Sequence, residues 1–423
     1  MTTRESRTDL QEQLRRLGVQ RGIVAIKPPP PRKRGPAIEE LVSGELPHTE
    51  HGSCFISETA YPLDHRHGEL PLSAPLDHDP RTAALLARDG AVGSVDLRRA
   101  AFIDTETTGL AGGTGTYAFL VGVGYYTDDA FHVRQFFMRD VVEERAMLHL
   151  LGEMLDGFRA VVSFNGRAFD LPLLSTRFTL ARMAPRLIDA PHLDLLLPAR
   201  RLWRRRLASC ALSSLEKNVL GVEREEADVP GWLIPGLYFD YLRSGDARPM
   251  HRVFYHNAQD ILSLVTLAGR LCAALADPMS EESALCGSDV HSLGRWYGRL
   301  DMPRRAEQAY RAALARPLPA EVRDVARRDL SLLLKRQGRG DEAAVIWNDL
   351  VQDGRDYQIW ACVELAKYYE WSLRNYPAAA RVTRLAIDAL QSAPTGSRVQ
   401  TELHELHHRL ARLERRMGLT QEV

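Results

Sequence analysis

The fold is decided by one stretch of the chain, Ala101-Phe102-Ile103-Asp104-Thr105-Glu106-Thr107-Thr108-Gly109-Leu110. Its first apolar residues predict a buried strand, and two acids follow two positions apart. Because side chains alternate between the faces of a strand, Asp104 and Glu106 point to the same face. Two carboxylates there repel each other unless a cation neutralises them, and such oxygen ligands suit Mg²⁺ or Mn²⁺. An isolated pair of this kind is more often a strand end whose acids are solvated or paired with arginine.

Two further segments add acids of the same kind. Asp170 lies at a predicted strand-to-helix junction, where Asn165 and Gly166 form a turn after the apolar run 160–164. The segment Tyr255-His256-Asn257-Ala258-Gln259-Asp260 begins an apolar helix. Residues four apart share a helix face, so His256 and Asp260 are expected side by side.

The three segments together resemble the motifs of the DEDD exonuclease superfamily, which has the ribonuclease H-like fold. Within it, the chain is most similar to the YprB-like bacterial proteins, which join such a domain to tetratricopeptide repeats. The run Gly112-Gly113-Thr114-Gly115-Thr116-Tyr117 and the order of the two domains carry this narrower match. The resemblance covers about residues 50–390.

The resemblance implies a metal-dependent 3′→5′ exonuclease that hydrolyses phosphodiester bonds at the end of single-stranded DNA or RNA. Asp104, Glu106, Asp170 and Asp260 would hold two divalent ions, Mg²⁺ or Mn²⁺, in a two-metal clamp. Substrate contacts are expected from a second group of residues, which lies beside the terminal nucleotide: Thr107, Gly109, Leu110 and Asn165.

The general base has two candidates. One subclass of the superfamily places Tyr four residues before the final Asp, and the other places His five residues before it. Here His256 lies four and Tyr255 five residues before Asp260, the reverse in each case. Helical geometry favours His256, because positions five apart diverge by about 140°, and imidazole suits proton abstraction near neutral pH. Tyr255 remains the second choice, and either residue could instead position water.

The domain containing these motifs is predicted over residues 98–276. Apolar runs at 100–104, 117–126, 133–138 and 160–164 predict strands, and 143–158 predicts an amphipathic helix. This order predicts an α/β domain in which helices flank a central sheet of mixed strand directions. Residues 1–50, with a proline–basic run at 26–34, are expected to be disordered, and 51–97 to be a partly ordered lead-in.

The last part of the chain, 285–423, is predicted to be entirely helical and repetitive. Ala306, Ala343 and Ala378 lie 37 and 35 residues apart, close to the ~34-residue tetratricopeptide period. The alternative is a helical bundle with alanines at its contacts. Because such repeats usually recruit proteins, we expect a protein partner.

A run of five arginines around one tryptophan, Arg200-Arg201-Leu202-Trp203-Arg204-Arg205-Arg206, has two interpretations. Arg201 and Trp203 could contact phosphate and stack on a base. Alternatively, the arginines form a solvated helix face and Trp203 is anchored in the core. Nearby Asp194 could support the site or pair with one of these arginines.

Composition limits the other possibilities. The 55 basic residues balance 55 acidic ones, so nucleic-acid contact must come from a local patch. Five cysteines without CxxC spacing indicate reduced thiols in a cytoplasm. No signal peptide and no run of ~18 uncharged apolar residues are present, so no membrane is expected. The competing functions are a non-catalytic adaptor, with repeats that bind protein and a nuclease-like domain that binds nucleic acid, and a structure-specific endonuclease.

Overall fold

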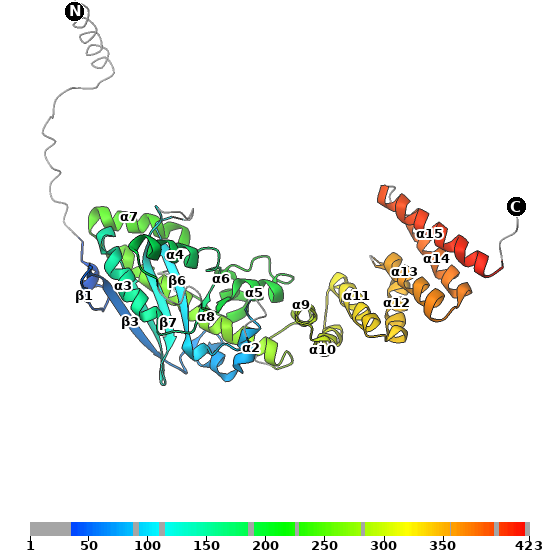
Figure 1. Cartoon of the computed structure of the whole chain (residues 1–423), viewed down its shortest axis with the longest axis horizontal. Helices are drawn as coiled ribbons and strands as arrows, with labels where there is room; N and C mark the ends of the chain where they lie inside the picture. The colour runs from blue at the N-terminus through cyan, green and yellow to red at the C-terminus, as the bar shows by residue number, and fades with distance from the viewer. Residues whose placement is uncertain are drawn as a thin grey trace, which may run out of the picture.

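The computed structural model of the chain describes residues 35–87, 93–109, 115–184, 190–224, 228–280, 284–355, 357–392 and 397–418. An α/β part comes first and is followed by a row of helices that ends far from it (Figure 1). The predicted substrate contact Leu110, the glycines at 112–113 and the proline–basic run 26–34 lie outside the described residues.

The described residues form a central six-stranded sheet in the order β10-β9-β6-β7-β8-β3. Strands β6, β9 and β10 are parallel, whereas β7, β8 and β3 join through antiparallel pairs. The strands of this sheet are β3 Phe55–Pro62, β6 Ala100–Thr107, β7 Ala118–Tyr126, β8 Ala130–Phe137, β9 Ala160–Ser163 and β10 His192–Asp194. Two small hairpins precede β6: β1 His48–Thr49 with β2 Gly52–Ser53, and β4 Arg66–His67 with β5 Leu70–Pro71. The predicted mixed sheet is confirmed.

The lead-in differs from the prediction because it supplies a full strand. β3 pairs with β8 over eight residues, from Phe55 with Phe137 to Pro62 with Ala130. Residues 35–50, expected to be disordered, include a 3₁₀ turn, Ile38–Glu40, in which Ile38 is only 1% exposed. This segment is ordered because its apolar side chain joins the core under the sheet.

Helices cover both faces of the sheet because β6 is apolar on both faces. Ala101 and Ile103 face one core, and Ala100 and Phe102 face another, which continues into later helices. The first core includes α3 Glu144–Leu155, α4 Asp170–Ala181, α7 Ile234–Ser244 and the first turns of α8 Arg248–Ala276, and the second includes α5 Leu196–Trp203 and the rest of α8. Short α2 Pro80–Ala84 and α6 Leu212–Leu215 lie near the second core (Figure 1).

Helix α8 lies very close to β7. A Cβ atom at Gly122 would stand 2.3 Å from Oδ1 of Asn257, and one at Gly124 would stand 2.5 Å from Cγ2 of Ile261. No side chain fits there, so both glycines are needed for the helix to reach the sheet. This contact sets how far α8 projects toward β6.

By length and composition alone, α8 would pass as a membrane-spanning helix. However, 89% of its most apolar window is buried inside the structure, as in a helix at the core of a globular domain. It is the one helix of this kind in the described part of the chain.

The C-terminal part is helical, as predicted. Its helices are α9 Gly287–Arg299, α10 Pro303–Leu314, α11 Ala320–Arg336, α12 Gly340–Asp353, α13 Gln358–Lys367, α14 Tyr376–Gln391 and α15 Ser397–Arg416. Ala306 and Ala343 are fully buried, but in the third copy the fully buried alanine is Ala379 rather than Ala378. We call residues 284–418 the helical region.

Candidate active site

Asp104 and Glu106 lie in the second half of β6, on the face covered by α8. Nδ2 of Asn257 donates a hydrogen bond to Oδ2 of Asp104 at 2.8 Å. Gln135 holds this amide in turn, because its Nε2 donates to Oδ1 of Asn257 at 2.9 Å. Asn257 is completely buried, so its orientation is fixed by packing and by these bonds.

The predicted acids interact with one another. Burial raises the pKa of Asp104 well above its ordinary value, and the charges of Asp260, Glu106 and Asp170 raise it further. The pKa of Glu106 is raised in the same way, by burial first and then by Asp260 and Asp170. Acids from three separate sequence motifs therefore lie close enough to interact electrostatically.

Asp170 approaches this cluster from the other side of β6. It begins helix α4, and its Oδ1 accepts a hydrogen bond of 2.5 Å from Oγ1 of Thr105. Thr105 lies between the two acids of β6, so its side chain points to the opposite face. Burial raises the pKa of Asp170 to about 6, although the bond from Thr105 opposes this rise.

Asp194 anchors the turn that leads to Asp170. Its Oδ1 accepts from the backbone N–H groups of Asn165, at 2.8 Å, and Leu196, at 3.1 Å, and its Oδ2 accepts from that of Arg167, at 3.2 Å. Asn165 has a left-handed backbone conformation, with φ of 63°, which asparagine tolerates well. These bonds fit the first of the two roles considered for Asp194, which is support of the site.

A single arginine forms ion pairs with three acids at the site. Arg224 pairs with Asp260, with Oε1 of Glu216 at 2.5 Å and with Oδ2 of Asp228 at 3.1 Å. Glu216 is 3% exposed in its side chain, so its ion pair with this arginine is buried. Sequence reasoning missed Arg224, Glu216 and Asp228, because no motif or spacing marks them and only the tertiary fold places them at the site.

His256 is oriented toward Asp260, as predicted. Nδ1 of His256 lies 2.8 Å from Oδ1 of Asp228 and 3.1 Å from Nη1 of Arg224, and Nε2 lies 3.7 Å from Oδ2 of Asp260. Tyr255 lies close enough to Tyr61, on the edge strand β3, for its charge to raise the pKa of Tyr61. Of the two candidate bases, His256 is the one whose ring nitrogens lie beside acids of the site.

The chemistry of these donors fits a hard divalent cation. Buried carboxylates that raise one another's pKa are stabilised when a cation supplies positive charge. Among the described residues, however, no three acids, histidines or cysteines already stand in metal-binding geometry. Asp170 is held by Thr105 and Asp260 by Arg224, so side chains must rotate for the four predicted ligands to converge.

The residues that were predicted to contact the substrate lie in several different places. Thr107 ends β6, and its hydroxyl donates to the carbonyl of Gly109 at 3.0 Å. Trp203 is 1% exposed, so it cannot stack on a base, and its anchoring in the core is the interpretation that fits. Arg201 lies instead over the ring of Trp296 in α9, with its guanidinium carbon 5.4 Å from the ring centre.

Comparisons with known proteins agree with this geometry. Residues 101–272, which contain all four acids, match a family described as the RNase_H superfamily. The chain is also 34% identical over 371 residues to the uncharacterized protein YprB of Bacillus subtilis (strain 168), and the match covers 86% of each chain.

Proposed function

Because this chain belongs to the family of YprB and has a ribonuclease H superfamily domain, we propose that it is a metal-dependent 3′→5′ exonuclease. Its substrate is the end of single-stranded DNA or RNA. The observation that carries the proposal is the buried cluster formed by acids from three motifs, in which burial and the charges of Asp260 and Asp170 raise the pKa values of Asp104 and Glu106. Strongly perturbed acids of this kind are typical of functional sites.

Two bound divalent ions would supply a hydroxide nucleophile at neutral pH and stabilise the leaving 3′ oxygen. The residues of the chain prepare this site in separate ways. Asn257 orients Asp104, and Thr105 orients Asp170, through hydrogen bonds from neutral donors, which add no positive charge to the site. Asp228 holds Nδ1 of His256, so Nε2 is free of that bond and can accept a proton from the attacking water.

We also propose that the helical region forms tetratricopeptide-like repeats that bind a protein partner. Fully buried Ala306 and Ala343 allow close approach of paired helices, as such repeats require. This binding role adds to hydrolysis and does not replace it.

The direct test is digestion of single-stranded DNA and RNA carrying a 5′ label, with Mg²⁺ or Mn²⁺. We expect a ladder of products shortened from the 3′ end, and Asp104→Asn should slow it at least about a hundredfold. Asp240→Asn is the matched control, because Asp240 is an exposed acid of α7 that pairs only with neighbouring Arg243 among the described residues. Absence of metal-dependent cleavage on both substrates would refute the proposal.

A further inference from the structure

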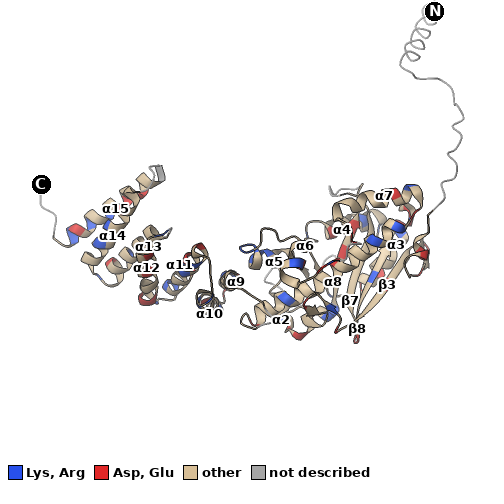
Figure 2. Cartoon of the chain, turned by 180° about the vertical axis from the view of Figure 1, so that it is seen from behind, with Lys and Arg blue, Asp and Glu red and all other residues tan. Residues whose placement is uncertain are grey.

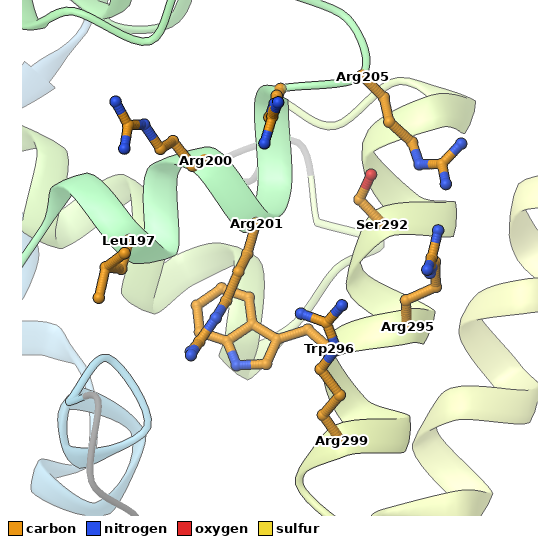
Figure 3. Close-up of a pocket in the computed structure, with 9 residues that line it drawn as sticks. Leu197, Arg200, Arg201, Arg205, Ser292, Arg295, Trp296 and Arg299 are labelled. Atoms are coloured by element: carbon orange, nitrogen blue, oxygen red, sulfur yellow. The ribbon is translucent and has the colours of Figure 1, made fainter.

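Six arginines surround one hollow between α5 and α9. The hollow has a volume of about 630 Å³ and also contains Leu197, Ser292 and Trp296. Figure 3 shows Arg201 lying over Trp296, and the side chains of Arg205, Arg295 and Arg299 along the α9 side of the hollow. We call this hollow the arginine pocket; its arginines are Arg200, Arg201, Arg204, Arg205, Arg295 and Arg299.

The walls of the arginine pocket are held in place. Nε of Arg206, just after α5, pairs with Oδ2 of Asp289 in α9 at 3.0 Å, and Asp289 is 1% exposed. Trp203 and Trp296 are also buried, at 1% and 2% exposed, so each helix is anchored in the core beneath the pocket. These contacts fix the positions of the two segments that carry the arginines of the pocket.

The positive charge of the pocket is largely uncompensated. Among the described residues, no carboxylate lines it. Within the described part of the chain, Arg200, Arg204 and Arg299 pair with no acid, and Arg295 reaches Asp329 only at 3.7 Å. Burial lowers the pKa of Arg205, and the charge of Arg295 lowers it further. Because the whole chain has no net charge, this concentration of arginine is local, and Figure 2 shows basic (blue) and acidic (red) residues interspersed over the chain as a whole. A bound polyanion would relieve the repulsion.

The topology connects the arginine pocket to the acids. The parallel strands β6, β9 and β10 end at the same edge of the sheet, and α5 begins at Leu196, two residues after β10. Two strand spacings and one to two helical turns place the pocket roughly 10–20 Å from the carboxylates. At ~3.4 Å per stacked nucleotide, this gap corresponds to about three to six nucleotides.

We propose that the arginine pocket binds the sugar–phosphate backbone of a single-stranded substrate, several nucleotides upstream of the 3′ end held at the acids. This inference rests on the proposed function for its direction along the strand. Arginine suits the role, because its planar guanidinium binds phosphate through two donors and stacks on bases. Trp296 keeps Arg201 oriented from below. The pocket therefore joins the nuclease domain and the helical region in one substrate path.

The test measures binding of a fluorescent 20-nucleotide single strand by anisotropy, in EDTA so that cleavage does not interfere. Arg204→Ala/Arg299→Ala removes one exposed arginine from each wall. We expect about tenfold weaker binding at 0.1 M salt, and a slope of log affinity against log salt that is smaller by about 1.4. Arg204→Lys/Arg299→Lys should keep the slope, because the charge remains. Arg243→Ala/Arg381→Ala is the matched control, since both arginines are exposed and lie outside the pocket.

The outcomes separate the two proposals. Unchanged affinity and slope in Arg204→Ala/Arg299→Ala, with the thermal transition of the unmodified chain, would overturn the role of the arginine pocket. Polyglutamate serves as a second ligand in the same assay. If Arg204→Ala/Arg299→Ala keeps its affinity for the single strand but loses polyglutamate binding, the role of the pocket is also overturned, and an acidic protein is indicated as the occupant. If the chain binds the single strand as expected but never cleaves it, the proposed exonuclease activity is refuted, while the arginine pocket stands as a binding surface.

Discussion

The acids of the site differ in what holds them. Asp104 and Asp170 each accept a hydrogen bond from a neutral side chain, which orients the carboxylate without cancelling its charge. Asp260 is paired with a full positive charge on Arg224. A cation that binds Asp260 must therefore compete with Arg224, whereas at Asp104 and Asp170 it meets oriented carboxylates.

The choice between the two candidate bases yields a prediction. His256→Ala should lower kcat by about 10²–10⁴, because it removes the group whose Nε2 faces Asp260. Tyr255→Phe should change kcat by less than about threefold, because the proposed base is the imidazole and not the phenol. Steady-state kinetics on the labelled single strand measures both.

If His256 had a purely structural role, its replacement would also change KM and the affinity for metal. We expect KM and the affinity for Mn²⁺, measured by calorimetry, to stay within a few fold in His256→Ala. A larger loss of kcat in Tyr255→Phe than in His256→Ala would contradict the assignment of His256 as the general base. Asp228→Asn should fall between the two, because it only weakens the orientation of the imidazole.

Local spacing predicted some of these residues and could not predict others. The pairs Asp104 with Glu106 and His256 with Asp260 follow from the periods of one strand and one helix. Asn257 could not be inferred, because its bond to Asp104 depends on where α8 crosses the sheet. Trp203 was ambiguous for the same reason, since burial is a property of the tertiary fold.

At the scale of elements, the site depends on the contact between α8 and β7. Gly122→Ala would place a methyl group 2.3 Å from Oδ1 of Asn257, so the helix must shift or the amide must turn away. We expect a loss of about 1–3 kcal/mol in stability, measured by urea unfolding, together with weaker hydrolysis. The matched control Gly236→Ala in exposed α7 meets no atom within 4 Å and should be neutral or slightly stabilising.

A double variant separates packing from function. Gly122→Ala/Asn257→Ala removes the clash and should recover part of the stability. It should not recover activity, because Asp104 then lacks its amide donor. Recovery of both would mean that Asn257 has only a packing role.

The strands β9 and β10 carry a pH-dependent contribution to stability. Oγ of Ser163 lies 2.8 Å from Nε2 of buried His192, and burial lowers the pKa of this histidine to about 4. The unfolded chain has the ordinary histidine pKa of about 6.5, so between pH 6.5 and 4 the unfolded state binds more protons. The contribution of His192 is complete above pH 6.5 and falls by about 3 kcal/mol as the pH approaches 4.

The prediction is checked by urea unfolding at several pH values. His192→Gln should flatten the decrease in the free energy of unfolding between pH 6.5 and 4. His149→Gln, on half-exposed surface of α3, should leave it unchanged. An equally steep decrease in the His192→Gln chain would exclude this histidine as the cause.

The sequence predicts strands where the apolar pattern is long. It does not predict strands that form mainly because they pair with a neighbouring strand. The runs that became β6, β7, β8 and β9 are strongly apolar and were predicted. β10 has three residues, too few for any period to be visible. β3 alternates poorly beyond Ile56, because only its first half is buried while its whole length pairs with β8.

At the scale of the molecule, one apolar core extends from the sheet into the helical region. It includes Phe102 of β6, Leu275 of α8, Trp296 of α9 and Trp347 of α12. Tyr297 adds a hydrogen bond of 2.8 Å from its hydroxyl to the carbonyl of Leu275. The sequence indicated two domains but could not show this shared core, because the contacts join residues that no local pattern relates.

The shared core predicts that the two parts do not unfold independently. A chain ending at residue 280 loses the cover that Trp296 gives to α5 and α8, and burying a tryptophan and its neighbours is worth several kcal/mol. We expect its melting temperature to fall by about 10 °C or more. A chain ending at residue 392 is the control, because the buried residues of α15, Leu406 and Leu413, belong to separate clusters. Calorimetry should therefore show the main transition unchanged in that control. An unchanged transition in the chain ending at residue 280 would mean that the helical region is independent, and the arginine pocket would then lack a fixed second wall.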